Sequence, residues 1–82
     1  MKINLTHNTT IERKAAQNKA FALGYGWING TFKQVRNLKE NFMFFDDIPL
    51  LQGAKVLTCC NDQKIFLDSK NKEITYTELF TK

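Results

Sequence analysis

The sequence is poor in the residues that most often build metal and catalytic sites. It has a single histidine, His7, two cysteines, Cys59 and Cys60, and only four glycines, none of them in a phosphate-binding loop. A zinc site needs about four Cys or His ligands at set spacings, and a catalytic thiol needs a histidine with an orienting partner. These scarcities argue against an enzyme and against a bound metal or other cofactor.

The chain also lacks any long apolar run. Its first ten residues do not form a signal peptide, and no segment approaches the roughly 20 apolar residues that span a bilayer. We therefore expect a cytoplasmic protein without membrane contact.

The two cysteines are not expected to pair. Neighbouring residues of a strand point to opposite faces, so a disulfide between the adjacent Cys59 and Cys60 would strain the backbone. Both are expected as reduced thiols, at least one of them buried.

Two features invite a chemical interpretation that their surroundings do not support. Asp46 and Asp47 are paired carboxylates, but they precede Pro49 at the end of an apolar run, without another acidic residue or histidine nearby in sequence. We interpret them as a solvated turn and not as a metal site. His7 lies in a polar turn, and we interpret it as a surface residue because a histidine rarely acts without an orienting partner.

The composition is that of one small globular domain spanning residues 1–82. Apolar residues make up 43% and charged residues 24% of the chain, which are ordinary values and argue against disorder. A chain of this size buries roughly 60 to 65% of its unfolded surface, so its core is thin. Its stability is expected to gain from self-association, and we consider a homodimer.

The formal charge of +4 makes the chain mildly basic. Its basic residues are spread along the sequence except for a cluster of Lys33, Arg36 and Lys39. Such a cluster is compatible with phosphate or with an acidic protein but requires neither. The simpler interpretation is a solvated surface.

Residues 9–24 carry the start and stop signals of a helix. Thr9 and Glu12 form a capping box, in which the Thr hydroxyl and the Glu carboxylate each accept from a backbone N–H at the helix start. Small apolar residues such as Ala16 and Ala20 recur on one face and allow close packing on a sheet, and the remainder of the helix is largely polar, with Arg13, Lys14, Gln17, Asn18 and Lys19. Gly24 follows the last turn, where a left-handed conformation costs glycine little.

Short apolar runs before and after this helix predict strands. We expect strands over residues 2–6, 41–46, 54–60 and 64–68, with 41–46 central because it is apolar on both faces. The Asn29-Gly30 pair predicts a hairpin turn, with Tyr25 and Trp27 before it and Phe32 and Val35 after it. The alternative is one irregular strand interrupted by a loop. Thr75 and Glu78 repeat the capping box and predict a short helix over 76–81. The predicted fold is α+β, a small antiparallel sheet of about four strands covered by one long helix with a short C-terminal helix, in the order β-α-β-β-β-β-α.

Large aromatics near the first helix suggest two non-enzymatic functions. We favour Trp27 and Phe32 as partly buried packing anchors, yet a seam of Tyr25, Trp27 and Phe32 would also suit docking on a protein. In the second hypothesis Trp27 and Phe32 stack bases, and the basic cluster neutralises phosphates of a single strand or a signalling nucleotide. A nucleotide pocket of that kind would lie between subunits.

Two groups of structural caps and anchors recur together from Thr9 onward: Ala22, Leu23, Gly24, Tyr25, Trp27 and Gly30, and then Glu73, Ile74, Thr75, Glu78, Leu79 and Phe80. In these residues the sequence resembles small uncharacterised α+β proteins encoded by bacteriophages and prophages. The resemblance implies an accessory protein acting in the host cytoplasm. Such proteins often bind a host protein, a nucleic acid or a signalling nucleotide, in host takeover or counter-defence.

Overall fold

The computed structural model describes residues 1–27, 33–48 and 53–82. Helix α1 (Thr10–Ala22) begins as predicted, because the Glu12 N–H donates to Thr9 Oγ1 at 3.1 Å and the Thr9 N–H donates to Glu12 Oε1 at 2.8 Å. The helix is stopped by Gly24, which follows the C-cap residue Leu23 and has a φ of +98°. The Gly24 N–H bonds Phe21 O and the Tyr25 N–H bonds Ala20 O, each at 3.0 Å, which is a Schellman stop.

The sheet is mixed and has five strands, in the order β2-β4-β3-β1-β5. These are β1 (Lys2–Asn4), β2 (Gly26–Trp27), β3 (Phe42–Ile48), β4 (Ala54–Cys60) and β5 (Glu73–Ile74). The pairs of β3 with β1 and with β4 are antiparallel, but β5 runs parallel to β1 and β2 parallel to β4. The α+β class and the central place of β3 are confirmed, while the prediction of an antiparallel sheet of about four strands is wrong at its edges. β2 lies where a strand was predicted directly after the first helix, whereas β5 was not predicted, because its two residues are too few for alternation to reveal.

The segment predicted as a strand over 64–68 is instead helix α2 (Gln63–Asp68). The Asp62 carboxylate caps it, accepting from the Lys64 N–H at 2.9 Å and the Ile65 N–H at 3.3 Å. A short apolar run does not distinguish helix from strand by its period, and here the cap decides. The predicted Asn29-Gly30 turn lies outside the described residues.

The C-terminal capping box forms as predicted. Thr75 and Glu78 exchange backbone-to-side-chain hydrogen bonds of 3.1 Å each and start helix α3 (Tyr76–Leu79), which is shorter than expected. Leu79 is fully buried, whereas Phe80 remains 42% exposed. The C-terminal end contacts α1, where Lys19 Nζ donates to Lys82 O at 2.8 Å.

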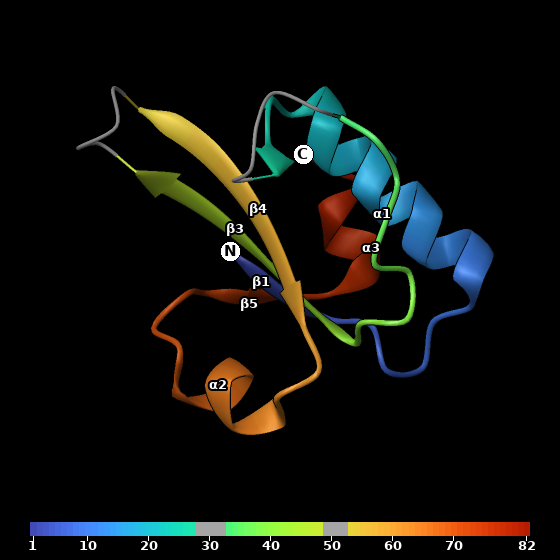
Figure 1. The fold of residues 1–82 in the computed structure, drawn as a ribbon, viewed down its shortest axis with the longest axis vertical. Helices are drawn as coiled ribbons and strands as arrows, with labels where there is room; N and C mark the ends of the chain where they lie inside the picture. The colour runs from blue at the N-terminus through green and yellow to red at the C-terminus, as the bar shows by residue number, and fades with distance from the viewer. Residues whose placement is uncertain (28–32, 49–52) are drawn as a thin grey trace.

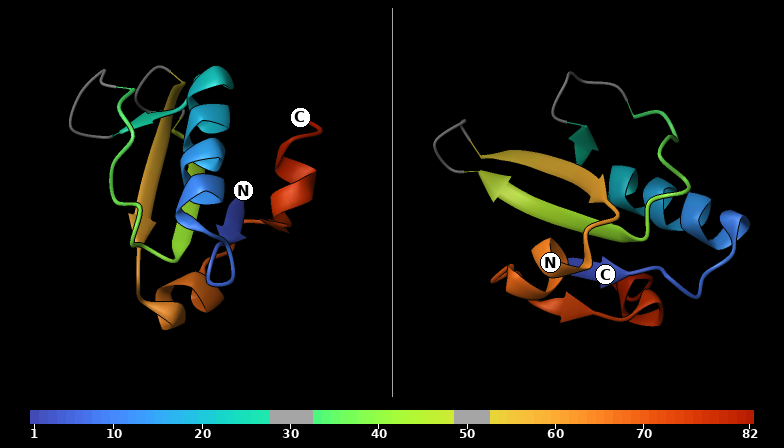
Figure 2. Two further views of the ribbon diagram at one scale, coloured as in Figure 1. Left: turned by 90° about the vertical axis from the view of Figure 1, so that its right-hand side faces the viewer. Right: turned by 60° about the horizontal axis from the view of Figure 1, so that its bottom comes forward.

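The two faces of the sheet are covered unequally. The first face, which contributes Ile3, Met43, Phe45 and Leu57, lies in the main core with α1, and α3 packs on the same side (Figures 1 and 2). The second face carries a smaller cluster of Phe42, Phe44 and Phe66, and among the described residues its cover comes from the six-residue α2. In the part of the chain that the structure describes, no helix is long and apolar enough to cross a membrane.

Candidate functional site

Tyr25 and Trp27, two of the predicted interaction residues, are core residues. Tyr25 is 6% exposed and meets the Phe45 ring edge-on at 5.4 Å, while Trp27 is 7% exposed and meets Phe21 at 6.2 Å. The indole Nε1 of Trp27 donates to Gln34 O at 2.8 Å. Packing, the role favoured for Trp27, therefore occupies most of both rings and leaves little of either for a partner. Phe32 lies outside the described residues.

The predicted basic residues all lie exposed on the segment 33–41, which passes along α1 to β3. The Arg36 guanidinium lies over the Trp27 ring, 5.5 Å from its centroid, and Lys33 Nζ donates to Phe21 O at 3.4 Å. Lys39 is exposed in the turn that precedes β3. The structure thus brings Arg36 and Trp27 together, with the cation covering the ring.

Side chains of α1 hold this irregular segment in place. Gln17 bonds the backbone of Arg36 at both ends of its amide, donating to the carbonyl and accepting from the N–H, the latter at 2.9 Å. The Arg13 guanidinium donates to backbone carbonyls of the turn that precedes α1, to backbone carbonyls of the segment 33–41, and to one side chain of that segment. Its acceptors are Leu5 O, Thr6 O, Asn8 O, Leu38 O, Glu40 O and Asn41 Oδ1, at 2.8 to 3.4 Å. From the sequence, both residues were assigned to the largely polar remainder of the helix, and this role in holding the segment was not predicted.

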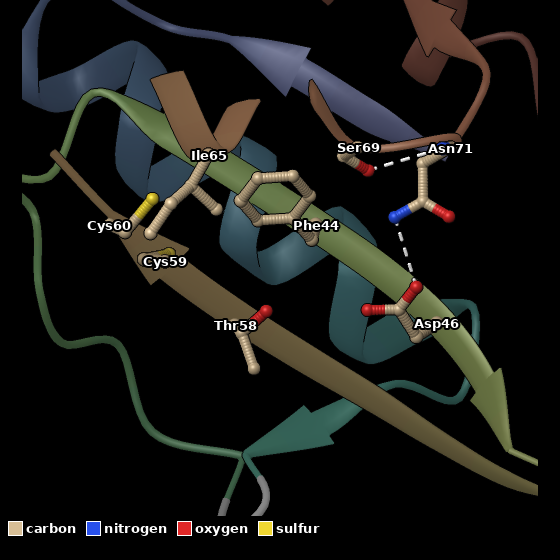
Figure 3. Close-up of a pocket in the computed structure, with 8 residues that line it drawn as sticks. All are labelled: Phe44, Asp46, Thr58, Cys59, Cys60, Ile65, Ser69 and Asn71. Atoms are coloured by element: carbon tan, nitrogen blue, oxygen red, sulfur yellow. Dashed lines mark hydrogen bonds between the residues drawn. The ribbon is translucent and has the colours of Figure 1, made fainter. Parts of the chain in front are cut away.

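A groove on the second sheet face has a volume of about 460 Å³ (Figure 3). Phe44, Asp46 and Thr58 come from the two long strands β3 and β4. Ile65 of α2 and Cys60 of β4 lie together at one end, and Ser69 and Asn71 come from the connection to β5. Figure 3 shows the Phe44 ring between the apolar end and the pair of Asp46 and Asn71.

The polar end of the groove is held by hydrogen bonds. Asn71 Nδ2 donates to Asp46 Oδ1 at 3.0 Å, and the Asn71 N–H donates to Ser69 Oγ at 3.1 Å. Asp46 supplies the one charged side chain among the described residues that line the groove. This arrangement fixes a carboxylate beside an aromatic ring, with the Thr58 hydroxyl on the same face of the sheet.

Helix α2 forms the apolar border of the groove and is itself anchored through Phe66. The Phe66 ring stacks on Phe42 at 4.7 Å, and Lys2 Nζ donates to the carbonyls of Phe66 and Ser69 while lying 4.7 Å from the Phe66 ring centroid. Lys2 therefore ties the end of α2 to β1. The neighbours of Phe66 point outward, and Ile65 is 55% and Leu67 65% exposed.

The reactive side chains of the described region do not assemble a catalytic set. Burial raises the pKa of the Cys59 thiol to about 12, so the nucleophilic thiolate is scarce at neutral pH. His7 lines a separate polar hollow with Asn4, Asn41 and Asn61, where no carboxylate or thiol faces it among the described residues. Within the same residues, no group of three or more His, Cys, Asp or Glu side chains could hold a metal ion.

Comparison of the chain with protein-family models, with curated proteins and with solved structures gave no match. The groove itself was not predicted from the sequence. One signal for it was present in β3, where Phe42, Phe44 and Asp46 share a face at alternate positions. Because residues 64–68 were predicted as a strand, the short helix that borders the groove was not anticipated.

Proposed function

We propose that this protein is a non-enzymatic accessory protein of the phage type that its sequence resembles, which binds and modulates a host protein in host takeover or counter-defence. The observation that supports binding is the half-covered second sheet face. There, a groove over Phe44 is lined by Ile65 of α2, which is 55% exposed. Leu67 of the same helix is 65% exposed, while Phe66 between them is buried.

The energetic reason is the apolar area left in water on that face. Burying an Ile or Leu side chain completely is worth about 1.5 to 3 kcal/mol relative to full exposure, so covering the exposed parts of Ile65 and Leu67 recovers roughly half of that for each. A polar residue at either position would avoid this exposure at little cost to α2. An exposed apolar side chain at a concave surface, as Ile65 is here, is typical of the centre of a protein interface.

The test is capture of a host protein by three tagged forms of the chain: the unchanged protein, the double variant Ile65→Asp with Leu67→Asp, and Ile11→Asp as the matched control. Ile11 is 81% exposed on α1, away from the groove. We expect one stoichiometric host protein with the unchanged chain and with Ile11→Asp, and at least about tenfold less with the double variant, because two charges would be desolvated.

Equal capture by the double variant, or no stoichiometric protein from any form, would contradict the proposal. Circular dichroism of the three forms verifies that each remains folded. Light scattering of the purified chain separates a homodimer from a host partner. A dimer that the double variant dissociates, without any captured host protein, would assign the groove face to a second copy.

A second candidate function is binding of single-stranded nucleic acid or a signalling nucleotide. It is favoured by the basic segment, where Lys33, Arg36 and Lys39 are all exposed while Arg13 and Gln17 fix the backbone. A base that displaced Arg36 from the Trp27 ring would alter the fluorescence of this single tryptophan. Titration with single-stranded RNA, DNA and cyclic nucleotides at low salt tests it. Affinity should fall steeply with salt, and an unchanged emission would argue against it.

A further inference from the structure

The groove on the second sheet face has two chemically different ends. Ile65 and the Cys60 side chain lie at one end, Asp46 and Asn71 lie at the other, and the Phe44 ring separates them (Figure 3). A ligand that filled the groove would need an apolar part over the ring and a polar part that reaches the carboxylate. The arrangement therefore selects for an amphipathic group.

The polar end favours a cation over a neutral donor. Asn71 Nδ2 occupies one site on Asp46 Oδ1, whereas a carboxylate has about four acceptor sites. In the described part of the chain no lysine, arginine or histidine lies within ion-pair distance of Asp46. Its neighbour Asp47, on the other face, has Lys55 Nζ at 3.7 Å. Asp46 is thus an oriented negative charge in a hollow, with acceptor capacity left for a ligand.

We infer that the groove receives a lysine or arginine side chain, carried by a segment of the partner protein that has apolar residues beside it. The alkyl stem lies over Phe44, and the cationic head donates to Asp46 and to the Thr58 hydroxyl. This inference rests on the proposed function, since it specifies which chemistry of the partner the groove face recognises. Long basic side chains suit such a site because the stem is apolar while the head is charged.

The surroundings of the groove favour a protein segment over a free amine. A small amine would satisfy Asp46 but would leave Ile65, which lines the groove, exposed. A segment with apolar residues flanking the basic one covers Ile65 while it places the cation. The net charge of +4 repels a uniformly basic partner, so the complementarity is local to Asp46 and requires one basic residue in an otherwise apolar segment.

The probes are three capped pentapeptides, alanine-leucine-X-leucine-alanine, in which X is lysine, norleucine or glutamate, and free lysine amide as a small amine. Binding is followed by nuclear magnetic resonance shifts of backbone amides at low salt. We expect the lysine peptide to shift the amides of Phe44, Asp46, Thr58 and Ile65. It should bind about fivefold or more tightly than the norleucine peptide, as a half-buried charge pair predicts.

Two substitutions make the measurement specific. Asp46→Asn keeps an oxygen for the Asn71 hydrogen bond but removes the charge, and it should weaken the lysine peptide about fivefold while leaving the norleucine peptide unchanged. Asp47→Asn removes an equal charge from the opposite face and should change neither. Equal affinity of the lysine and norleucine peptides, or of lysine amide and the lysine peptide, would overturn the inference. So would Asp46→Asn without effect, or shifts confined to the basic segment.

Host-protein capture distinguishes failure of this inference from failure of the proposed function. If capture is lost with Ile65→Asp and Leu67→Asp but retained in full with Asp46→Asn, the groove face binds the partner and the cation inference is wrong. If capture withstands all three substitutions, both are wrong. Capture reduced by Asp46→Asn and retained by Asp47→Asn supports both.

Discussion

At the scale of single residues, the side chains of Arg13 and Lys2 hold backbone segments in place, a role that their positions in the sequence did not indicate. Arg13 was grouped with the polar face of α1, yet its guanidinium donates to five backbone carbonyls and to Asn41 Oδ1. Lys2 begins a short strand, yet its side chain is only 6% exposed. Each holds a segment that has little regular structure of its own.

Replacing Arg13 by alanine should destabilise the protein by about 2 to 3 kcal/mol, because several backbone carbonyls lose a charged donor at once. Arg13→Lys should restore only part of this loss, since an ammonium cannot reproduce the fork of five N–H donors. Urea unfolding measures the effect, with the exposed neighbour Lys14→Ala as a control expected within about 0.5 kcal/mol of the unchanged protein. Equal midpoints for Arg13→Ala and Lys14→Ala would show that the segment 33–41 does not depend on this clamp.

Local signals predicted the residues whose roles are local. Thr9 with Glu12, Gly24, and Thr75 with Glu78 act within a few residues of their own positions, and all of them take their predicted roles. Arg13, Gln17 and Lys2 act on segments 19 to 67 residues away in the chain. A single sequence does not show such pairings, which depend on how the elements pack.

At the scale of elements, the errors concern the shortest segments. Helix α2 has six residues and was predicted as a strand, and the edge strands β2 and β5 have two residues each. Over so few residues hydrophobic periodicity has little power, and tertiary contacts decide the conformation. For α2 those contacts are the Asp62 cap, the Phe66 stack on Phe42, and the Lys2 ammonium at the last carbonyls.

Because Lys2 donates to the carbonyls of Phe66 and Ser69, Lys2→Met should loosen α2 while the methionine stem still packs on the ring. The Ser69 N–H, which bonds Ile65 O at 3.1 Å, should then exchange with solvent about 5- to 30-fold faster, equivalent to about 1 to 2 kcal/mol of local stability. Hydrogen exchange followed by nuclear magnetic resonance measures it. The control is Lys70→Met at an exposed position, and unaltered Ser69 exchange in Lys2→Met would contradict the anchoring role.

At the scale of the whole molecule, the main feature is that the two faces of the sheet are covered unequally. Helices α1 and α3 bury the first face, whereas among the described residues the second face is covered by α2 and holds a groove lined by the exposed Ile65. The α+β class, the long helix and the central strand were predicted correctly, so the first face could be anticipated. The second face could not, since α2 was assigned as a strand and the predicted aromatic site residues Tyr25 and Trp27 belong to the core.

The most direct test of the proposed groove interface is photo-crosslinking in host cells, with benzoylphenylalanine placed singly at Leu67, Ile11 or Lys39. All three positions are exposed, and they sample α2 (which contributes Ile65 to the groove), the outer side of α1 and the basic segment. We expect one dominant host-protein adduct from position 67 and little from positions 11 and 39. An adduct from position 11 or 39 with none from position 67 would contradict it, and nucleic acid crosslinked at position 39 would move the function to the basic segment.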